Sequence, residues 1–464
     1  MNSSEQQSIR AGVVGESVRA VVIGGGQAGL AVSHELTGLR VEHVVLERGR
    51  LAQTWRDRWD SFCLVMPNWS VQLPGGAYAG DDPDGFMPRD EIVRHLEAYA
   101  SSFAAPVREG VEVTSLDPTD QGGFAVRTAD GVLLAESVVL ATGAFQRPHR
   151  PPAARTLPAG IFQIDADSYR NPAALPPGKV LVVGSGQTGC QLAEELHEAG
   201  RDVFIACGRA PWSPRRIGDR DMVDWAVQTG AFEETLADLP ASPSPSSSCN
   251  SPSARLVSNP QSSGRGGGHD LHYRTLQRLG VTLLGRFLGV EDGHAHFASD
   301  LAASVAFGDA RYNETREKIA KLCSARGIAT PDMPEPAPFD PRAPDSVDLS
   351  GFGTVIFASG FRPDYASWVH LDTFDELGFP IHQDGASTAV PGLYFCGVHF
   401  LRKRKSSVLL GVGEDAGIVA RKVAAQVAVN PARSTVEPGF RPTPRPDARR
   451  ATRPLHASRS APAP

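Results

Sequence analysis

The chain has 464 residues, of which 41% are hydrophobic, and a formal net charge of −6. This length allows two or three domains, and the negative charge disfavours nucleic acid as a main partner. The N-terminal stretch lacks the apolar core of a signal peptide, and no uncharged apolar run reaches the roughly 18 residues of a membrane span. We therefore expect a cytoplasmic protein with no transmembrane segment.

A short β-branched run at residues 18–23 leads into a glycine-rich turn, and a segment with helical apolar spacing follows. This order predicts a strand, a turn and a helix. Glycines let the backbone approach a pyrophosphate, and the helix N-terminus supplies free N–H groups and positive dipole. The expected contacts, in G-x-G-x-x-G register, are Gly24, Gly26, Gln27, Ala28 and Gly29.

The strand after this turn ends in Glu47. A carboxylate at this position suits two ribose hydroxyls and would repel a 2′-phosphate. The first nucleotide site is therefore predicted to bind FAD.

A second turn of the same kind follows the apolar run at residues 179–183. The strand after it ends near Arg209, with no acidic residue there. Because an arginine suits a 2′-phosphate, the second nucleotide is predicted to be NADPH. The expected contacts of this turn are Gly184, Gly186, Gln187, Thr188 and Gly189.

Two later strands end in similar small-residue turns, one with Ala141, Thr142 and Gly143 and the other at residues 358–360. We interpret them as the two crossings between domains. The expected fold class is α/β, with two Rossmann-like domains and the NADPH domain inserted into a discontinuous FAD domain. The predicted boundaries are a flexible arm (1–17), the first segment of the FAD domain (18–150), the NADPH domain (151–355), the second segment of the FAD domain (356–429) and a disordered tail (430–464).

Residues 239–268 are rich in serine, proline and glycine, and are predicted to be a flexible surface insertion. The six cysteines contain no C-x-x-C pair. A flavoprotein that reduces disulfides needs such a dithiol, so electrons are expected to go elsewhere. No His/Cys cluster has metal-binding spacing, and no metal is expected.

Several stretches, including TWRDRWDSFCLVMPNW, PDGFMPRDEIVRHLEAYA, ATGAFQRP, ASGFRPDY and RKRKSSVLLGVGEDAG, resemble the flavin-containing monooxygenase superfamily. The likeness covers roughly residues 18–430, and the closest similarity is to bacterial flavoproteins labelled as involved in potassium transport. It implies FAD, NADPH and O₂ as reactants, and Asn68 as a catalytic residue facing the flavin ring. It further implies flavin contacts at Thr54, Trp55, Ala141, Thr142, Gly143, Gly397 and Leu409.

The superfamily fingerprint between the two nucleotide motifs is F-x-G-x-x-x-H-x-x-x-[YF]. Here Tyr169 fits its last position, whereas Asp165 stands where the histidine is expected. Both are candidate catalytic residues. A tryptophan at the last position would favour Baeyer–Villiger chemistry, so Tyr169 disfavours it.

The resemblance implies an NADPH-dependent FAD monooxygenase that forms a 4a-hydroperoxyflavin and oxygenates a nitrogen or sulfur nucleophile of a small molecule. The alternatives are an NADPH oxidase or reductase without substrate oxygenation, a Baeyer–Villiger monooxygenase, and a nucleotide-sensing flavoprotein without catalysis. The substrate and the oligomeric state are not readable from the sequence.

Other charged groups have less specific interpretations. We expect an ion pair between Arg58 and Asp60, and we weigh residues 402–405, a basic run, as either a surface patch or a steering site for anions.

His269 and His399 each have two interpretations, an acid–base group or a structural histidine. Arg215 and Arg216 also have two, a contact with a phosphate or a solvated pair of arginines.

Overall fold

The computed structural model describes residues 15–143, 145–239, 255–256 and 258–429, which belong to one compact unit. The predicted tail, most of the predicted arm and residues 240–254 and 257 of the predicted insertion lie outside the described residues. The first strand begins at Glu16, two residues earlier than predicted.

A nine-stranded sheet organises the first domain of the described chain. Its strands β1, β2, β5, β8 and β23 pair in parallel, whereas β6–β7–β8 and β21–β22–β23 pair antiparallel. The strands are β1 (Glu16–Ile23), β2 (His43–Glu47), β5 (Val107–Glu109), β6 (Val113–Pro118), β7 (Phe124–Thr128), β8 (Gly131–Leu140), β21 (His382–Gln383), β22 (Ala386–Ser387) and β23 (Leu393–Phe395).

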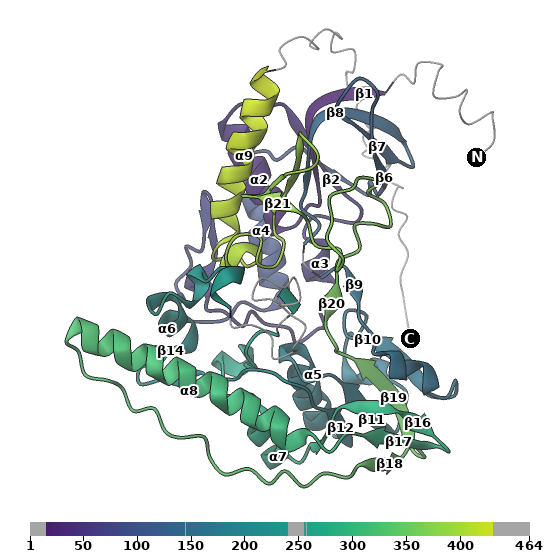
Figure 1. Cartoon of the computed structure of the whole chain (residues 1–464), viewed down its shortest axis with the longest axis vertical. Coiled ribbons are helices and arrows are strands. Elements are labelled where there is room, and N and C mark those ends of the chain that lie inside the picture. Colours follow the sequence, from purple (N-terminus) through teal and green to yellow (C-terminus); the bar gives the residue numbers. More distant parts are fainter. Residues whose placement is uncertain (1–14, 144, 240–254, 257, 430–464) are drawn as a thin grey trace, which may run out of the picture. The chain divides into compact units, whose positions relative to one another are not determined.

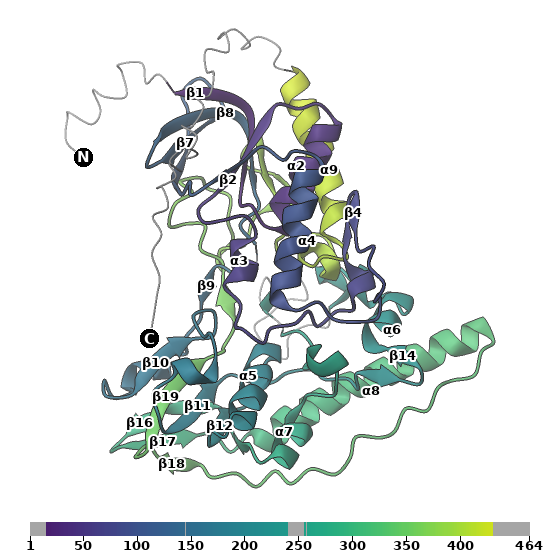
Figure 2. The same cartoon turned by 180° about the vertical axis from the view of Figure 1, so that it is seen from behind.

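Side chains of β1 alternate between two apolar cores, as expected for a strand with period two. Ala20 and Val22 pack with the helices, whereas Val21 and Ile23 pack with the β6–β7 hairpin. Figures 1 and 2 show the helices together on one face of the sheet. They are α2 (Gln27–Gly38), α4 (Arg89–Ser102) and α9 (Val412–Val429), with the short α3 (Gln53–Arg56) beside them.

The second sheet is five-stranded in the described residues, all parallel, in the order β10-β19-β11-β12-β15. Its two faces pack in separate cores, one with α5 and α7 and the other with the antiparallel β16–β18 sheet. The strands are β10 (Phe162–Asp165), β11 (Lys179–Val183), β12 (Val203–Ala206), β15 (Thr282–Leu284), β16 (Phe287–Glu291), β17 (His294–Phe297), β18 (Ser346–Asp348) and β19 (Phe352–Phe357). The helices are α5 (Gln187–Glu198), α6 (Met222–Gln228), α7 (Tyr273–Leu279) and α8 (Leu301–Arg326).

The two predicted crossings lie side by side. Strand β9 (Arg147–Pro148) follows the first small-residue turn and pairs antiparallel with β20 (Phe361–Arg362), which follows the second. The chain thus leaves the first sheet and returns to it through paired segments. The expected fold class is confirmed. The predicted boundary between residues 355 and 356 falls inside β19, and we propose to place the return after Phe357.

Short elements complete the described chain. The hairpins are β3 (Gln72–Leu73) with β4 (Gly76–Ala77), and β13 (Arg216–Ile217) with β14 (Arg220–Asp221). The 3₁₀ turns are η1 (Asn68–Ser70), η2 (Pro152–Thr156), η3 (Pro172–Ala174), η4 (Ala231–Glu233), η5 (Leu236–Asp238), η7 (Arg265–Gly267) and η8 (Arg404–Ser407).

Candidate functional site: two dinucleotide turns

The first glycine turn joins β1 to α2 and has the packing that a dinucleotide requires. Gly24 has φ +114°, and a Cβ on it would lie 2.5 Å from the carbonyl oxygen of Ala141. A Cβ on Gly29 would overlap the oxygen of Gly24, which keeps the helix close to the strand. At Gly26, by contrast, a Cβ would meet nothing within 4 Å. The turn therefore packs tightly at two glycines and leaves open space at the third, where a pyrophosphate fits.

Glu47 lies at the end of β2 beside this turn. Its Oε2 accepts the N–H of Gly25 at 2.8 Å, and its Oε1 accepts the N–H of Gly49 at 2.9 Å. The side chain is buried, so its carboxylate is fixed against the turn. This is the placement that the predicted ribose contact needs.

Gln27 connects the first turn to two distant segments. Its Oε1 accepts the indole N–H of Trp55 at 3.0 Å, and its Nε2 donates to the carbonyl oxygen of Ser407 at 2.8 Å. Gly397 has φ +75°, and a Cβ on it would lie 2.5 Å from the Cβ of Ala28. The structure thus brings together these predicted FAD contacts from α2, α3 and the segment before α9.

Of the remaining predicted FAD contacts, Ala141, Thr142 and Gly143 directly follow β8, Thr54 lies in α3 and Leu409 lies shortly before α9. Thr142 accepts a hydrogen bond from Gln146 at 3.0 Å, and Gly143 has φ +81°. Leu409 is buried in the core below α2 and α9, whereas Thr54 is exposed.

The second turn repeats the first. Gly184 has φ +105°, and a Cβ on it would lie 2.6 Å from the carbonyl oxygen of Ala358. A Cβ on Gly189 would overlap the oxygen of Gly184, and one on Gly186 would meet only the Cβ of Ser258, at 3.7 Å. Two turns far apart in sequence therefore have the same two tight glycines and the same open one, and Thr188 lies in the second of them at the start of α5.

The prediction that residues 239–268 form a solvated insertion is wrong for the stretch at 258–268. Gln261, Ser262 and Ser263 are fully buried. Gln261 donates to the carbonyl oxygen of Ser185 at 2.7 Å, and Gln187 donates to that of Pro260 at 3.1 Å. Small residues allow this segment to approach the second turn closely, and its polar groups find backbone partners there, so its composition does not prevent packing.

The three arginines after β12 differ in their surroundings. Arg209 and Arg216 are exposed and have no hydrogen-bond or ion-pair partner among the described residues. Arg215 is buried, its Nε donates to Asp221 at 2.8 Å and its Nη1 donates to the oxygen of Val65 at 2.7 Å. Arg209 is therefore available to a 2′-phosphate, whereas Arg215 ties the second domain to a loop of the first.

Asn68 does not present a free amide. Its Oδ1 accepts the N–H of Met87 at 2.7 Å, and its Nδ2 donates to the carbonyl oxygen of Asp82 at 2.9 Å. Because the side chain is buried and holds the 82–87 loop, its geometry favours a structural role over the predicted catalytic one.

Tyr169 and Asp165 are likewise occupied. Tyr169 is fully buried in the core of the second domain, and its hydroxyl donates to Glu195 at 3.3 Å. Burial raises the pKa of both groups. The carboxylate of Asp165 accepts two hydrogen bonds from Arg150, both at 2.8 Å. These contacts place Tyr169 and Asp165 in the framework around the crossings.

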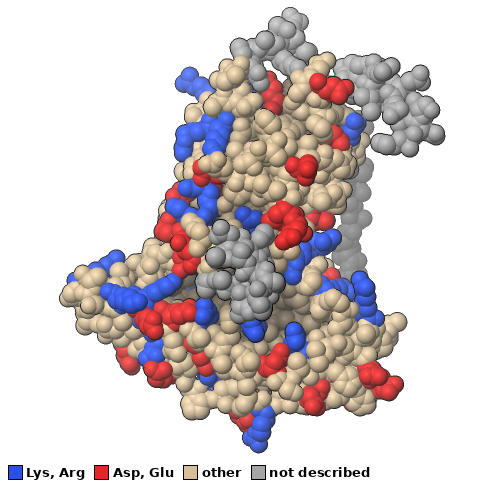
Figure 3. All heavy atoms as spheres, in the orientation of Figure 1, with Lys and Arg blue, Asp and Glu red and all other residues tan. Residues whose placement is uncertain are grey.

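The basic run at 402–405 is part of an ionic network. It is therefore neither a free basic surface patch nor a site with unpaired charges that could steer anions. Lys403 and Lys405 each reach Glu233 and Glu414 at 2.6–3.0 Å, and Arg404 reaches Glu234 at 2.7 Å. Basic and acidic side chains are interspersed over the described face in Figure 3. We call this network the ionic clasp, because it joins η4 to η8.

The two candidate histidines also differ. Nε2 of His269 shares a hydrogen bond with Glu194 at 2.7 Å, and this bond raises the pKa of His269. Burial lowers the pKa of His399 to about 4. The expected ion pair of Arg58 with Asp60 is not formed, because Asp60 pairs with Arg89 at 2.8 Å.

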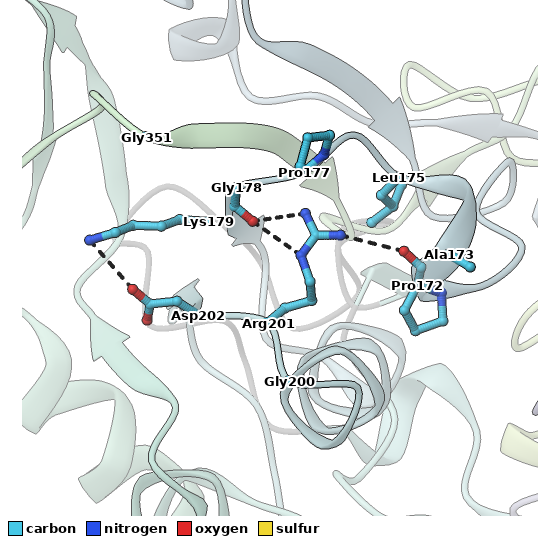
Figure 4. Close-up of a pocket in the computed structure, with 10 residues that line it drawn as sticks. All are labelled: Pro172, Ala173, Leu175, Pro177, Gly178, Lys179, Gly200, Arg201, Asp202 and Gly351. Atoms are coloured by element: carbon cyan, nitrogen blue, oxygen red, sulfur yellow. Dashed lines mark hydrogen bonds and ion pairs between the residues drawn. The ribbon is translucent and has the colours of Figure 1, made fainter.

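A surface depression of about 620 Å³ lies at the amino ends of β11, β12 and β19. Figure 4 shows Lys179 paired with Asp202, and Arg201 bonded to backbone oxygens of Gly178 and Pro172. Nucleotides bind at the carboxyl ends of parallel strands, so this depression lies at the opposite edge from the second turn.

Among the described residues, no group of His, Cys, Asp or Glu is arranged to hold a metal. No helix in the described ranges is long and apolar enough to cross a membrane.

The fold and the paired turns define an oxidoreductase with two dinucleotide sites. Residues 21–222 match the pyridine nucleotide-disulphide oxidoreductase family. A CzcO-like oxidoreductase of Geobacillus kaustophilus is 31% identical over 375 residues, which cover 80% of this chain and 88% of the relative. Rice indole-3-pyruvate monooxygenase YUCCA1 is 32% identical over 203 residues, 38% of this chain and 50% of the relative. The flavin-containing monooxygenase of Stenotrophomonas maltophilia has the same fold, with a TM-score of 0.59 and 20% identity over 88% of this chain and 99% of that one.

The chain therefore belongs to the CzcO-like oxidoreductases. By this relationship it is an oxidoreductase. FAD and NADPH stay its predicted cofactors.

Proposed function

We propose that this protein is an NADPH-dependent monooxygenase that transfers one oxygen atom of O₂ to a nitrogen or sulfur nucleophile of a small molecule. The observation that carries the proposal is the repeated turn: a Cβ on Gly26 would meet nothing within 4 Å and one on Gly186 only the Cβ of Ser258 at 3.7 Å, whereas the first and last glycines of each turn admit no side chain. Two dinucleotides can thus bind to one chain, one to receive electrons and one to deliver them.

In this proposal the first turn binds FAD and the second binds NADPH. Glu47 holds the ribose of the first nucleotide, and Gln27 fixes α3 and the segment before α9 around it. Arg209 receives the 2′-phosphate of the second. Bound FAD would supply the two-electron and oxygen chemistry, while the protein positions the reactants and excludes water.

The cysteines support oxygen as the electron acceptor. In the described ranges, Cys63, Cys190, Cys207, Cys323 and Cys396 are all free. Burial raises the pKa of Cys190 and Cys207, which keeps both groups as thiols, the form that is a poor nucleophile. A dithiol route to a disulfide substrate therefore has no pair of cysteines among these residues.

Asp165 favours a second candidate, an NADPH oxidase that releases peroxide without oxygenating a substrate. It replaces the histidine of the superfamily fingerprint and is held by Arg150. If that histidine contributes to protecting activated oxygen, its replacement weakens the coupling of NADPH use to product.

Steady-state coupling tests the proposal. The FAD-loaded protein is supplied with NADPH, O₂ and a panel of amines and thioethers, and NADPH loss, peroxide and oxygenated product are measured together. We expect at least one panel member to give product nearly stoichiometric with NADPH. Stoichiometric peroxide with every member would instead establish the oxidase.

A further inference from the structure

Arg58 is a largely buried cation that no anion contacts in the described residues. It lies just after α3, and its Nε atom is inaccessible to solvent and has no hydrogen-bond partner. No carboxylate among the described residues comes within ion-pair distance of it. Its neighbours Arg56, Arg89 and Arg170 all have acidic partners. Arg58 is therefore the exception in a loop of paired arginines.

Two aromatic rings lie beside the guanidinium. Its carbon is 5.4 Å from the ring centre of Phe145 and 5.7 Å from that of Phe62. Phe145 in turn contacts Phe361, with 5.2 Å between the ring centres. Aromatic faces attract a cation, but they offer no acceptors to its N–H groups.

The nearest acidic residues are engaged elsewhere. Asp57 bonds to Gln53 and pairs with Arg170, and Asp167 accepts the hydroxyl of Ser168. Both act on Arg58 only at longer range. Burial lowers the pKa of Arg58, yet a guanidinium keeps its charge in proteins. A permanent charge with an unused donor is thus kept largely out of water.

The position of this charge links it to the reaction. Phe145 follows the turn at the carboxyl end of β8, and Phe361 follows the turn at the carboxyl end of β19. Ligands of parallel sheets bind at the carboxyl ends of the strands. Arg58 therefore lies where both sheets present their ligand-binding edges.

We propose that Arg58 is a specificity-determining residue that receives a carboxylate of the substrate. The two terminal nitrogens of a planar guanidinium form an edge with parallel N–H groups, which matches the two oxygens of a carboxylate, and in Arg58 only Nε is among the buried atoms without a partner. This inference rests on the proposed function, since it assigns the substrate of that site. The predicted substrate is a small carboxylic acid that also carries the nitrogen or sulfur to be oxygenated.

Calorimetric titration of the full-length, FAD-loaded protein tests this proposal. The probes are (methylthio)acetate, (phenylthio)acetate and indole-3-acetate, small acids that carry a sulfur or a nitrogen, each compared with its neutral amide. We expect at least one acid to bind at least tenfold more tightly than its amide, and Arg58→Met to weaken that acid at least tenfold. The matched control is Arg278→Met, which removes an exposed positive charge at the end of α7 and is expected to change nothing. Arg58→Lys keeps the positive charge but loses the planar pair of N–H donors. We therefore expect this variant to bind the acid at least threefold more weakly than the parent, a result that does not depend on whether the methionine variant folds.

The proposal is overturned if no acid binds with a dissociation constant below 10 mM, a binding free energy of roughly −3 kcal/mol. It is also overturned if acids and amides bind equally, or if the Arg58 variants bind acids as tightly as the parent does. Loss of FAD or of NADP⁺ affinity in these variants, with acid binding retained, would assign the cation to a cofactor and contradict the proposal. Reduction of the flavin by NADPH is measured separately. Failure there would count against the monooxygenase itself and leave the binding result intact.

Discussion

Gln27 and Gln187 occupy the same position in the two glycine turns, and each donates its side-chain amide to a backbone carbonyl from a distant segment. The acceptor for Gln27 is Ser407 at 2.8 Å, and the acceptor for Gln187 is Pro260 at 3.1 Å. Both turns are therefore completed by chain that follows much later in sequence. The first nucleotide site depends on the segment before α9, and the second depends on the end of the predicted insertion.

Two glycines of the first turn predict different effects of substitution, one on stability and the other on FAD binding. Gly29→Ala forces a Cβ onto the oxygen of Gly24, so we expect a loss of about 1–3 kcal/mol in the free energy of unfolding. Gly26→Ala places its methyl group in open space and should leave the apoprotein as stable as the parent, but it should abolish FAD binding. Thermal unfolding and the flavin-to-protein ratio separate the two. A Gly26→Ala protein that retains full flavin would contradict the assignment of this turn.

Arg209 predicts the choice between NADPH and NADH. Removing one charged partner of a phosphate costs about 1.5–3 kcal/mol, which corresponds to roughly tenfold to 150-fold in affinity. We therefore expect Arg209→Gln to weaken NADPH by that factor while NADH, which lacks the 2′-phosphate, is unaffected. The dissociation constants of both nucleotides are the measurement, with NADH as the internal control. Equal weakening of both would place Arg209 outside the phosphate site.

The His269–Glu194 pair predicts a pH-dependent stability. The hydrogen bond that His269 donates to Glu194 raises the pKa of His269 above the ordinary value near 6.5. A raised folded pKa adds stability that is complete below about pH 6.5 and is lost as the pH rises through the folded pKa. His269→Gln should therefore destabilise the protein more at pH 6 than at pH 9.

Unfolding curves of parent and variant at both pH values give this difference. Taking the difference cancels the contributions of buried histidines that both proteins share, such as His272 and His399. An equal effect of the substitution at pH 6 and pH 9 would show that Glu194 does not stabilise the protonated form of His269.

The ionic clasp predicts a salt-sensitive contribution to stability. Glu234 pairs with Arg404 at 2.7 Å and with Lys318 at 2.6 Å, and its side chain is mostly buried. Glu234→Gln should cost about 1–2 kcal/mol, between the values for exposed and buried pairs. The cost should shrink in 0.5 M NaCl, because salt screens partly exposed charges. Glu376→Gln, at an exposed position with no ion pair among the described residues, is the control. A cost independent of salt would indicate lost packing.

Much of the fold was predictable because local sequence determines it. The two strand-turn-helix units follow from β-branched runs, glycine spacing and helical apolar spacing. The crossings were predictable from two similar small-residue turns, and the β9–β20 pairing agrees with them.

The site was predictable only where its geometry is local. Glu47 is the last residue of β2 and Arg209 lies shortly after β12, so their positions near the two turns follow from local sequence, while their contacts with nucleotides stay predictions. The hydrogen bonds of Asn68 could not be predicted, because its partners, Asp82 and Met87, come from a loop whose path no spacing reveals. The partners of residues 402–405 lie near residue 233, and the burial of Gln261 depends on a turn about 75 residues earlier. Such contacts are tertiary, and composition alone made both segments look solvated.

The unpaired state of Arg58 had no signal in the sequence. Asp60, two residues away, was the natural partner to expect, and it is taken by Arg89 and Asn171. Only the positions of Arg89 and Asn171, on α4 and before η3, reveal that Arg58 is left without an anion.

The most direct test of the account is rapid mixing of NADPH-reduced protein with oxygenated buffer, followed by absorbance. The monooxygenase account predicts a transient species, distinct from both reduced and oxidised flavin, that persists for seconds or longer when NADP⁺ is bound. Direct return of the oxidised spectrum with stoichiometric peroxide, unchanged by NADP⁺ and by the carboxylate probes, would contradict it.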